Sequence, residues 1–493
     1  MRVRIAWLGV ALALAPGCKA AEEDYEHGNA QCSDLVDNDG DRLVDCADPG
    51  CRGTSVCPSL GGDGGSSTDA QSGDPPVVPR QKDHFFTVNP QRAVDFLVVV
   101  DNSNTMAEEQ SLLAKAWPQL VTSMALLPGG LPSLRIGVVS TDLGAADYGL
   151  PTCMTKGGDG GRLQSKPRIA ECTPPSLPWI EYADGKTNVP SAGDAVAQIT
   201  QGFSCIAQLG TGGCGFEHQL QAMRLALDPQ KGVNRGFLRA EAPLVVLLVT
   251  DEDDCSAANT TLFDPSQHGL SDPLGPLNSF RCFEFGVTCD VNDRNKLGPR
   301  KNCVPSQEYL FKVQEYVSFL KGLKPGGQAA LVAIAGPPEP VEVIKEGTMP
   351  GLAPSCGAKG TLVNASPSVR LWSVVSGLGQ GSFLAPICTT DFVPIMARVG
   401  QLVRDKLGAA CLQALKDTDS APGPQVNCVV EDVRPGGGAA KLEACKALAG
   451  PCDPCPCWRV ISRSECGSGT ALEVARSTPV PPGTLVRARC EGL

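Results

Sequence analysis

The feature that most constrains this chain is an apolar run that ends in an acid. Val94–Val100 reads VDFLVVV, Asp101 follows at once, and Ser103 and Thr105 come after it at alternate positions. A run of this kind, rich in β-branched residues, is typical of a strand buried in a parallel sheet. Because such a strand delivers its next side chains at the carboxyl edge of the sheet, the pattern predicts an α/β fold with oxygen ligands for a metal ion.

A second segment repeats the pattern. Pro243–Thr250 reads PLVVLLVT and is followed by four acids, Asp251 to Asp254. An acid after one strand is often only a helix cap. In an open, doubly wound sheet, however, ligands bind beyond the carboxyl ends of the strands where the strand order reverses. Two acid-ended strands, with Ser103 and Thr105 beside the first, therefore favour a metal site.

The Asp101-x-Ser103-x-Thr105 motif resembles the metal-ion-dependent adhesion site of the von Willebrand factor type A (VWA) family, with Thr105 where that family has a second serine. The resemblance implies a doubly wound, mostly parallel sheet in which the strands before Asp101 and Asp251 are neighbours. It also implies that Ser103 and Thr105 bind the ion directly, and Asp101 and Asp251 mainly through water. Hydroxyls, carboxylates and retained waters suit Mg²⁺, with Mn²⁺ or Ca²⁺ as alternatives. The open position would accept a carboxylate from a partner.

The family's site also takes a threonine from the loop before a central helix, and Gly210–Gly215 is similar to that loop. Counting back from the expected helix puts Cys214 at the threonine position. A disulfide-bonded cysteine cannot bind a hard metal ion, so Thr211, which carries the only hydroxyl in the loop, is the candidate ligand.

The first residues predict export. Residues 1–17 combine a basic start with an apolar core and small residues before Cys18, and so resemble a bacterial lipoprotein signal. The motif before Cys18 has one extra residue, and Pro16 stands where that family has a small residue. The alternative is an ordinary secretory signal. No later stretch has the roughly 20 apolar residues of a membrane-spanning helix. We therefore expect an exported protein held in the cell envelope, at the outer membrane, by lipid on Cys18.

The cysteine content agrees with export. Of 23 cysteines, all but Cys18 form an even set that can pair in an oxidising compartment. Near neighbours such as Cys153 with Cys172, and Cys205 with Cys214, are candidate pairs. The cysteines of the C-terminal module, including Cys452, Cys455 and Cys457, could bind zinc, but in an exported chain without a nearby histidine we expect disulfides.

A small module at residues 18–57 encloses an acidic loop that resembles the calcium loops of thrombospondin type 3 repeats and EF-hands. The alternatives are Ca²⁺ binding and a merely solvated acidic loop. The carboxylates concerned are Asp37, Asp39, Asp41 and Asp45.

The remaining organisation follows from composition and periodicity. Residues 58–90 are rich in Gly, Ser, Asp and Pro and predict a linker, residues 91–415 predict the VWA-like domain, and residues 416–493 a small Cys-rich module. Within the main domain, residues 112–124 predict a helix that Pro118 breaks or kinks near Trp117. Residues 144–190 and 255–303 predict irregular, disulfide-held insertions. Helices are expected at 192–209, 216–227, 306–323, 366–377 and 392–415, and further strands at 134–141, 329–335 and 381–384.

Composition limits the function. The net charge is −11 and no block of Lys or Arg interrupts it, so nucleic acid and anionic lipid surfaces are poor partners. Common catalytic motifs are missing and the chain has four histidines, so we expect a protein that is not an enzyme. We predict a surface-anchored, metal-dependent adhesion protein that recognises a protein or glycan. The alternatives are an envelope structural protein with a decayed metal site and a secreted metal-dependent hydrolase.

Overall fold

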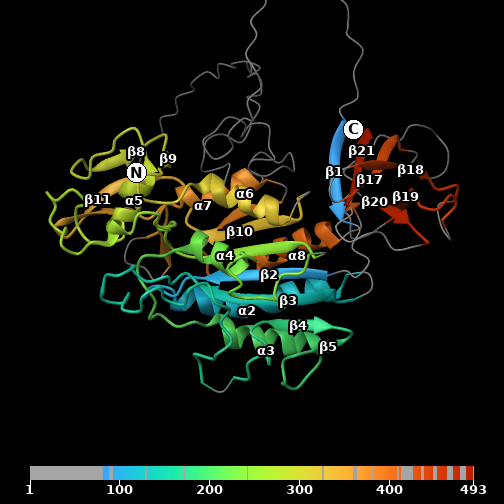
Figure 1. The fold of residues 1–493 in the computed structure, drawn as a ribbon, viewed down its shortest axis with the longest axis horizontal. Helices are drawn as coiled ribbons and strands as arrows, with labels where there is room; N and C mark the ends of the chain where they lie inside the picture. Colours follow the sequence, from blue (N-terminus) through green and yellow to red (C-terminus); the bar gives the residue numbers. More distant parts are fainter. Residues whose placement is uncertain are drawn as a thin grey trace, which may run out of the picture. The chain divides into compact units, whose positions relative to one another are not determined.

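A computed structural model describes the main domain and much of the C-terminal module (Figure 1). The predictions for Cys18 and for Asp37, Asp39, Asp41 and Asp45 lie outside the described residues. Those residues are 81–87, 93–127, 130–170, 172–240, 242–324, 327–358, 363–379, 381–407, 410–411, 426–434, 438–447, 452–462, 470–477 and 485–491.

The main domain is built on a seven-stranded sheet with the order β15-β10-β6-β2-β3-β4-β5. Neighbouring strands from β15 to β3 run parallel, and β4 and β5 add an antiparallel edge that the sequence analysis did not predict. The predicted mixed α/β class with a mostly parallel sheet is confirmed. The strands are β2 (Ala93–Val100), β3 (Ser133–Ser140), β4 (Ile180–Ala183), β5 (Lys186–Thr187), β6 (Leu244–Val249), β10 (Ala329–Ala335) and β15 (Phe383–Pro386).

The strand order reverses between β2 and β6. From β2 the chain passes to β3 on one side, and later returns to β6 on the other side of β2. The register pairs Val100 with Val249, so Asp101 and Asp251 leave neighbouring strands at the same edge. This is the position at which ligands bind in doubly wound sheets.

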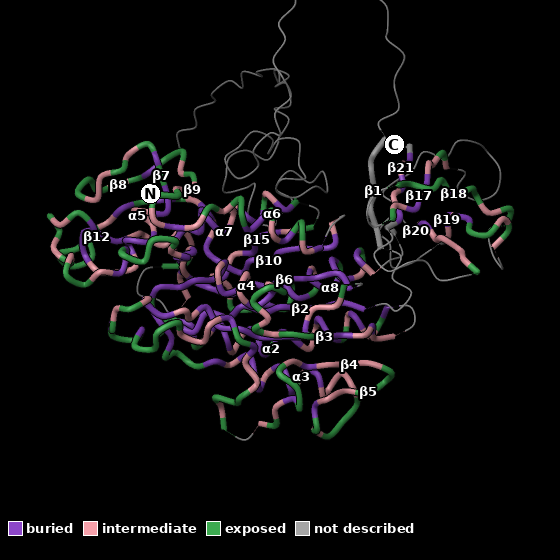
Figure 2. Tube along the Cα trace, in the orientation of Figure 1, coloured by how far each residue is buried: buried purple, intermediate pink, exposed green. Residues whose placement is uncertain are grey.

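Helices cover both faces of the sheet, because the side chains of each buried strand alternate between the two faces. On one face, Leu97 and Val99 of β2 pack with α4, α6 and α7. On the other, Phe96 meets Trp117 of α2, and α3 and α8 pack beside α2. Figure 2 shows the central strands buried between these layers. The helices are α2 (Ala107–Ala125), α3 (Ala195–Ala207), α4 (Gln219–Leu227), α6 (Val313–Leu323), α7 (Val369–Leu378) and α8 (Val393–Leu407).

Of the break or kink predicted at Pro118, the break is wrong, because α2 runs through this residue, and the kink stays a prediction. Proline inside a helix costs about 3 kcal/mol. Trp117, fully buried, stacks on Phe203 of α3 with ring centroids 3.5 Å apart and meets Phe96 edge-on. Packing of this aromatic cluster outweighs the local preference to end the helix.

The first insertion is held by disulfides other than the candidate pairs. Cys153 bonds Cys214, and Cys172 bonds Cys205. Pairing of sequence neighbours is therefore wrong at both places. Each cysteine of the insertion bonds a partner from α3 or from the loop after it, 33 or 61 residues along the chain.

The second insertion contains more regular structure than predicted. Its disulfides join Cys255 to Cys282 and Cys289 to Cys303. Its last strand, β8, extends the hairpin of β11 and β12, which the sequence analysis missed. The elements of this region are η3 (Thr260–Phe263), α5 (Phe280–Gly286), β7 (Val287–Thr288), β8 (Gly298–Arg300), β9 (Val304–Pro305), β11 (Val341–Glu346), β12 (Met349–Leu352), β13 (Cys356–Gly357) and β14 (Asn364–Ala365).

A second seven-stranded sheet has the order β1-β21-β17-β18-β19-β20-β16 and its own core around Val430, Trp458 and Leu472. Residues 81–87 of the predicted linker form its edge strand β1, paired with β21. Cys452 bonds Cys455 and Cys445 bonds Cys457, which agrees with disulfides and not zinc. The strands are β1 (Gln81–Thr87), β16 (Ala410–Cys411), β17 (Cys428–Val433), β18 (Ala439–Ala444), β19 (Cys457–Ser462), β20 (Thr470–Ala475) and β21 (Leu485–Glu491).

Candidate metal centre

The residues after β2 form a tight, hydrogen-bonded loop around Asp101. The Asp101 carboxylate is fully buried, accepts a hydrogen bond from the Ser103 backbone N–H at 2.8 Å, and accepts another from the Thr250 hydroxyl at 2.6 Å. The Ser103 and Thr105 hydroxyl oxygens lie 3.4 Å apart, and Thr105 is exposed. The loop therefore holds the Asp101 carboxylate and Ser103 inside the protein and exposes Thr105 at its surface.

The loop after β6 brings Asp251 to the same place. Asp251 is buried, it lines the same cavity as Thr105, and its Oδ1 atom has no hydrogen-bond partner. Burial, and after it the charge of Asp101, raise the pKa of Asp251 well above its usual value. The structure thus brings together four of the five predicted site residues: Asp101, Ser103, Thr105 and Asp251.

The loop Gly210–Gly215 lies against the first loop of the site. The Gly213 backbone N–H donates to the Asn102 carbonyl at 2.7 Å, and a Cβ atom on Gly213 would lie 2.3 Å from Asn102 Oδ1, so this approach requires glycine. The predicted ligand Thr211 is exposed. Among the described residues, no hydrogen bond joins Thr211 to the four residues named above, and its role as a metal ligand stays a prediction.

Two further carboxyl groups at this edge were not predicted as site residues: Glu217 is buried and Glu252 is half-buried. Glu217, one residue inside the segment predicted as a helix, is 1% exposed and its Oε2 atom has no hydrogen-bond partner. Burial first, then the charges of Glu252, Asp101 and Asp251, raise the pKa of Glu217 well above its usual value, and burial raises that of Glu252 to about 7.

The four acids after β6 have four different environments. Asp253 accepts hydrogen bonds from the backbone N–H groups of Arg370 and Leu371 in the first turn of α7. Asp254 forms a fully buried ion pair with Arg370 at 3.2 Å. Their charges are balanced by a helix terminus and by a guanidinium. Only Asp251 and Glu252 are left facing other carboxyl groups, which a sequence reading of the acidic run does not reveal.

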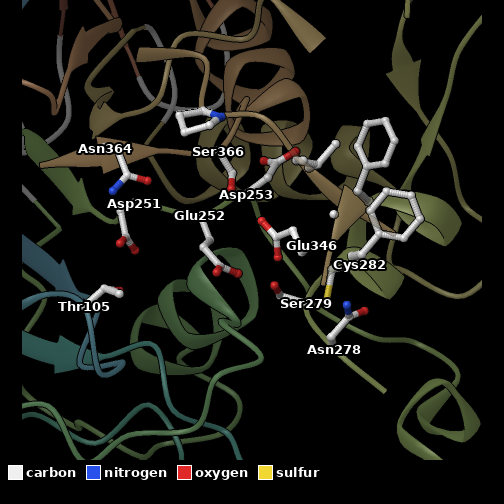
Figure 3. Close-up of a pocket in the computed structure, with 15 residues that line it drawn as sticks. Thr105, Asp251, Glu252, Asp253, Asn278, Ser279, Cys282, Glu346, Asn364 and Ser366 are labelled. Atoms are coloured by element: carbon white, nitrogen blue, oxygen red, sulfur yellow. The ribbon is translucent and has the colours of Figure 1, made fainter. Parts of the chain in front are cut away.

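A cavity of about 330 Å³ opens beside Thr105 and Asp251. Figure 3 shows Asp251 between Thr105 and Asn364, and Glu252 with Glu346 and Ser279 nearby. The lining residues are Thr105, Asp251, Glu252, Asp253, Asn278, Ser279, Phe280, Cys282, Phe283, Glu346, Gly351, Leu352, Pro354, Asn364 and Ser366. A partner group can therefore reach Thr105 and Asp251 from the protein surface.

The available donors are hard oxygen atoms, which suit Mg²⁺, Mn²⁺ or Ca²⁺. In the described part of the chain, no three His, Cys, Asp or Glu side chains form a group that could hold a metal ion by themselves. A cation at this edge needs the hydroxyls of Ser103 and Thr105, and water, to complete its ligands. The unpartnered Oδ1 of Asp251 fits such a group, because a buried carboxylate oxygen without a partner is costly.

Comparisons with known proteins add little. No protein-family model and no curated protein matches the sequence. The similar solved structures include proximal thread matrix protein 1 from the mussel byssus (12% identity, 65% of this chain and 49% of that chain, TM-score 0.27). They also include the pilus adhesin SpaC of Lactobacillus rhamnosus GG (11% identity, 85% of this chain and 43% of that chain, TM-score 0.31). A third is the pilus adhesin RrgA of Streptococcus pneumoniae (9% identity, 83% of this chain and 57% of that chain, TM-score 0.30).

This chain spans about half the length of each of those three proteins, from 43% to 57%. TM-scores this low do not identify a shared fold or function. Within the described residues, no helix is both long and apolar enough to cross a membrane.

Proposed function

We propose that this chain is a surface-attached protein with a VWA-type domain that binds a protein or glycan partner through a metal-bridged carboxylate. One observation carries the proposal. Two buried carboxylates, Asp101 and Asp251, follow neighbouring parallel strands at the point where the strand order reverses, beside the hydroxyls of Ser103 and Thr105.

In this proposal Ser103 and Thr105 bind the ion directly, and Asp101 and Asp251 hold it mainly through water. The bound ion, Mg²⁺ with Mn²⁺ or Ca²⁺ as alternatives, supplies a positive charge for a partner's carboxylate. The residues of the chain do the rest. Thr250 and the Ser103 N–H orient Asp101, and the cavity beside Asp251 admits the partner.

The test uses the oxidised, full-length mature protein and calorimetry with Mg²⁺ and Mn²⁺. Because Asp101 orients waters and loop around the cation, we expect Asp101→Ala to weaken metal binding by about 10- to 100-fold. Thr105→Val should also weaken it, since a methyl group replaces the ligand oxygen, while Thr105→Ser keeps a hydroxyl and serves as the matched control. Unchanged metal affinity in both Asp101→Ala and Thr105→Val would refute the proposal.

Partner binding is measured by pull-down from cell envelope, with and without chelator. Capture that depends on metal in the wild type and is lost in Asp101→Ala supports adhesion. An envelope structural protein with a decayed metal site would bind no metal in the wild type, so calorimetry separates it from the proposed function.

The disulfides of the described residues suit an exported protein. We propose in addition that lipid on Cys18 anchors it at the outer membrane. Cys18→Ser should then move the protein from the membrane fraction to the soluble fraction. Wild-type protein that is already soluble would contradict the anchor.

A further inference from the structure

The cavity beside Thr105 is lined by acids from two parts of the chain. Asp251, Glu252 and Asp253 come from the loop after β6, and Glu346 comes from the end of β11. Figure 3 shows Glu346 across from Glu252. Of the described residues that line the cavity, none is Lys, Arg or His. A cleft with charges of one sign concentrates ions of the other sign, so this cavity favours a positively charged group.

Two acceptor atoms of the lining residues have no donor. They are Oδ1 of Asp251, a residue that is 7% exposed, and Oδ1 of Asn278. The Asn278 amide is oriented by its Nδ2 atom, which donates to the Pro350 carbonyl at 3.2 Å and so leaves Oδ1 as the unused acceptor. A buried acceptor without a donor is unfavourable. Ammonium and guanidinium groups are cations that offer several N–H donors and no acceptor, and they therefore suit both atoms.

The nearby cationic side chains of this chain are engaged elsewhere. The Arg281 guanidinium is fully buried and donates to backbone carbonyl groups at 2.7, 2.8 and 2.9 Å. Arg370 pairs with Asp254. Lys345 precedes Glu346 on β11, and successive side chains of a strand point to opposite faces. Among the described residues, none of these three cations lines the cavity, so a positive charge there has to come from a partner.

The cavity also has apolar lining residues. Phe280 and Phe283 of α5 have ring centroids 5.7 Å apart, and Leu352 and Pro354 come from the end of β12 and the segment after it. Cations bind favourably over aromatic rings, and the alkyl stems of Lys and Arg pack on apolar surface. The volume of about 330 Å³ lies in the range of roughly 300–1,000 Å³ that is usual for ligand pockets. The cavity therefore suits a cation on an apolar stem.

We propose that this cavity binds the basic side chain, Arg or Lys, of a protein partner. The inference deepens the proposed function and rests on it for the neighbouring metal-bridged carboxylate. The partner then presents an acidic residue to the ion beside Thr105 and a basic residue to the cavity. Such a pair of opposite charges identifies the partner as a protein segment and not a glycan.

The test uses the oxidised, full-length mature protein in the presence of chelator, so that a metal ion plays no part. Ligand-observed NMR titration measures the Kd of acetyl-arginine amide and of acetyl-lysine amide. Acetyl-citrulline amide is the matched control ligand, because it keeps the shape of the arginine side chain without the charge. We expect the arginine ligand to bind about tenfold or more tightly than the citrulline ligand, the size of effect expected for charged hydrogen bonds.

Glu346→Gln is the main variant, because it keeps the shape of the side chain and removes its charge. Glu346 is exposed on β11, so the variant is expected to fold. It should weaken acetyl-arginine amide by about tenfold, since a charged hydrogen bond is lost. Glu342→Gln is the matched control: Glu342 is exposed on the same strand and does not line the cavity. It removes the same charge and should leave the affinity nearly unchanged.

Gly351→Ala tests the position of the Glu346 carboxylate. Gly351 lies on β12, and a Cβ atom there would lie 2.5 Å from the Cδ atom of Glu346. The flexible end of Glu346 then has to move, whereas the backbone does not. We expect Gly351→Ala to weaken acetyl-arginine amide as well. Wild-type affinity in both Glu346→Gln and Gly351→Ala overturns the proposal.

Further outcomes overturn it too. If the wild type binds neither the arginine nor the lysine ligand, or binds the citrulline ligand equally well, the cavity does not recognise a basic side chain. Equal weakening in Glu346→Gln and Glu342→Gln shows an effect of overall charge only. Galactose or N-acetylglucosamine that binds more tightly than acetyl-arginine amide, and is weakened by Glu346→Gln, assigns the cavity to a glycan.

The presence of chelator separates this proposal from the proposed function. If the wild type binds acetyl-arginine amide in chelator but binds no metal ion in calorimetry, the metal-bridged adhesion fails and the basic-side-chain site stands. If the wild type binds metal but not the arginine and lysine ligands, only the inference about the cavity fails.

Discussion

The two ends of strand β2 each carry a buried aspartate, and the two are satisfied in different ways. At the amino end, Asp95 accepts from the Arg239 backbone N–H at 2.7 Å and from its Nε at 2.8 Å. At the carboxyl end, Asp101 is held by neutral donors only, from Ser103 and Thr250, and it lies near the acids Asp251 and Glu217. Asp95 thus has a counter-charge from the chain itself, in Arg239, whereas the described hydrogen bonds of Asp101 come from uncharged groups.

This difference shows how to distinguish a buried acid that stabilises the fold from a buried acid that belongs to a binding site. Burial raises the pKa of Asp95 and Asp101 alike, but Arg239 opposes the rise at Asp95. An ion pair that the chain itself completes stabilises the fold without a ligand. A group of buried acids without a cationic side chain is completed only from outside, by a proton or a metal ion.

The largest effect is expected from breaking the pair at the amino end. Arg239→Met leaves Asp95 buried without its counter-charge, and losing one partner of a buried pair costs about 3–5 kcal/mol. Denaturant unfolding of the oxidised protein measures the loss, and metal affinity should not change. A loss below about 1 kcal/mol would show that the two ends are not different in this respect.

A smaller effect on the free energy of unfolding is expected when a cation binds at the carboxyl end of β2. A cation that binds only the folded chain, at 100 times its Kd, should raise the free energy of unfolding by about 2.7 kcal/mol. We expect this gain in the wild type and in Arg239→Met, and its loss in Asp101→Ala. An equal gain in Asp101→Ala would place the cation elsewhere.

The smallest effect is the change of the free energy of unfolding with pH, measured in the presence of chelator. The pKa of Glu252 is raised from 4.5 to about 7, so the folded chain holds this proton more tightly than the unfolded chain. The resulting stability is fully present below about pH 4.5 and is lost as pH rises toward 7. We expect the free energy of unfolding to fall by roughly 1–3 kcal/mol over this window.

Glu252→Gln is the control for that pH dependence, because an amide does not titrate. It should reduce the slope, and the remainder belongs to the other carboxyl groups whose pKa burial raises, among them Asp251, Glu217 and Asp253. A slope that is the same in the wild type and in Glu252→Gln would contradict the assignment of the shifted pKa to Glu252.

Much of the main domain could be predicted from the sequence, because the signals are local and strong. Val94–Val100 and Pro243–Thr250 are apolar throughout most of their length, and both form buried parallel strands. The helical spacing after each strand also predicted the covering helices. No comparable pattern predicts the edge strands β4 and β5 or the hairpin of β11 and β12, because these strands are short and partly exposed.

The position of the acids that follow β2 and β6 could also be predicted from the sequence, because the residue after a strand lies at the edge of the sheet. Which acid does what was decided by the tertiary structure alone. Asp254 meets Arg370 from α7, Asp253 meets the start of the same helix, and the charge of Glu252 raises the pKa of Glu217. Each partner comes from a distant part of the chain, and no local pattern records which distant groups share one buried, low-dielectric space.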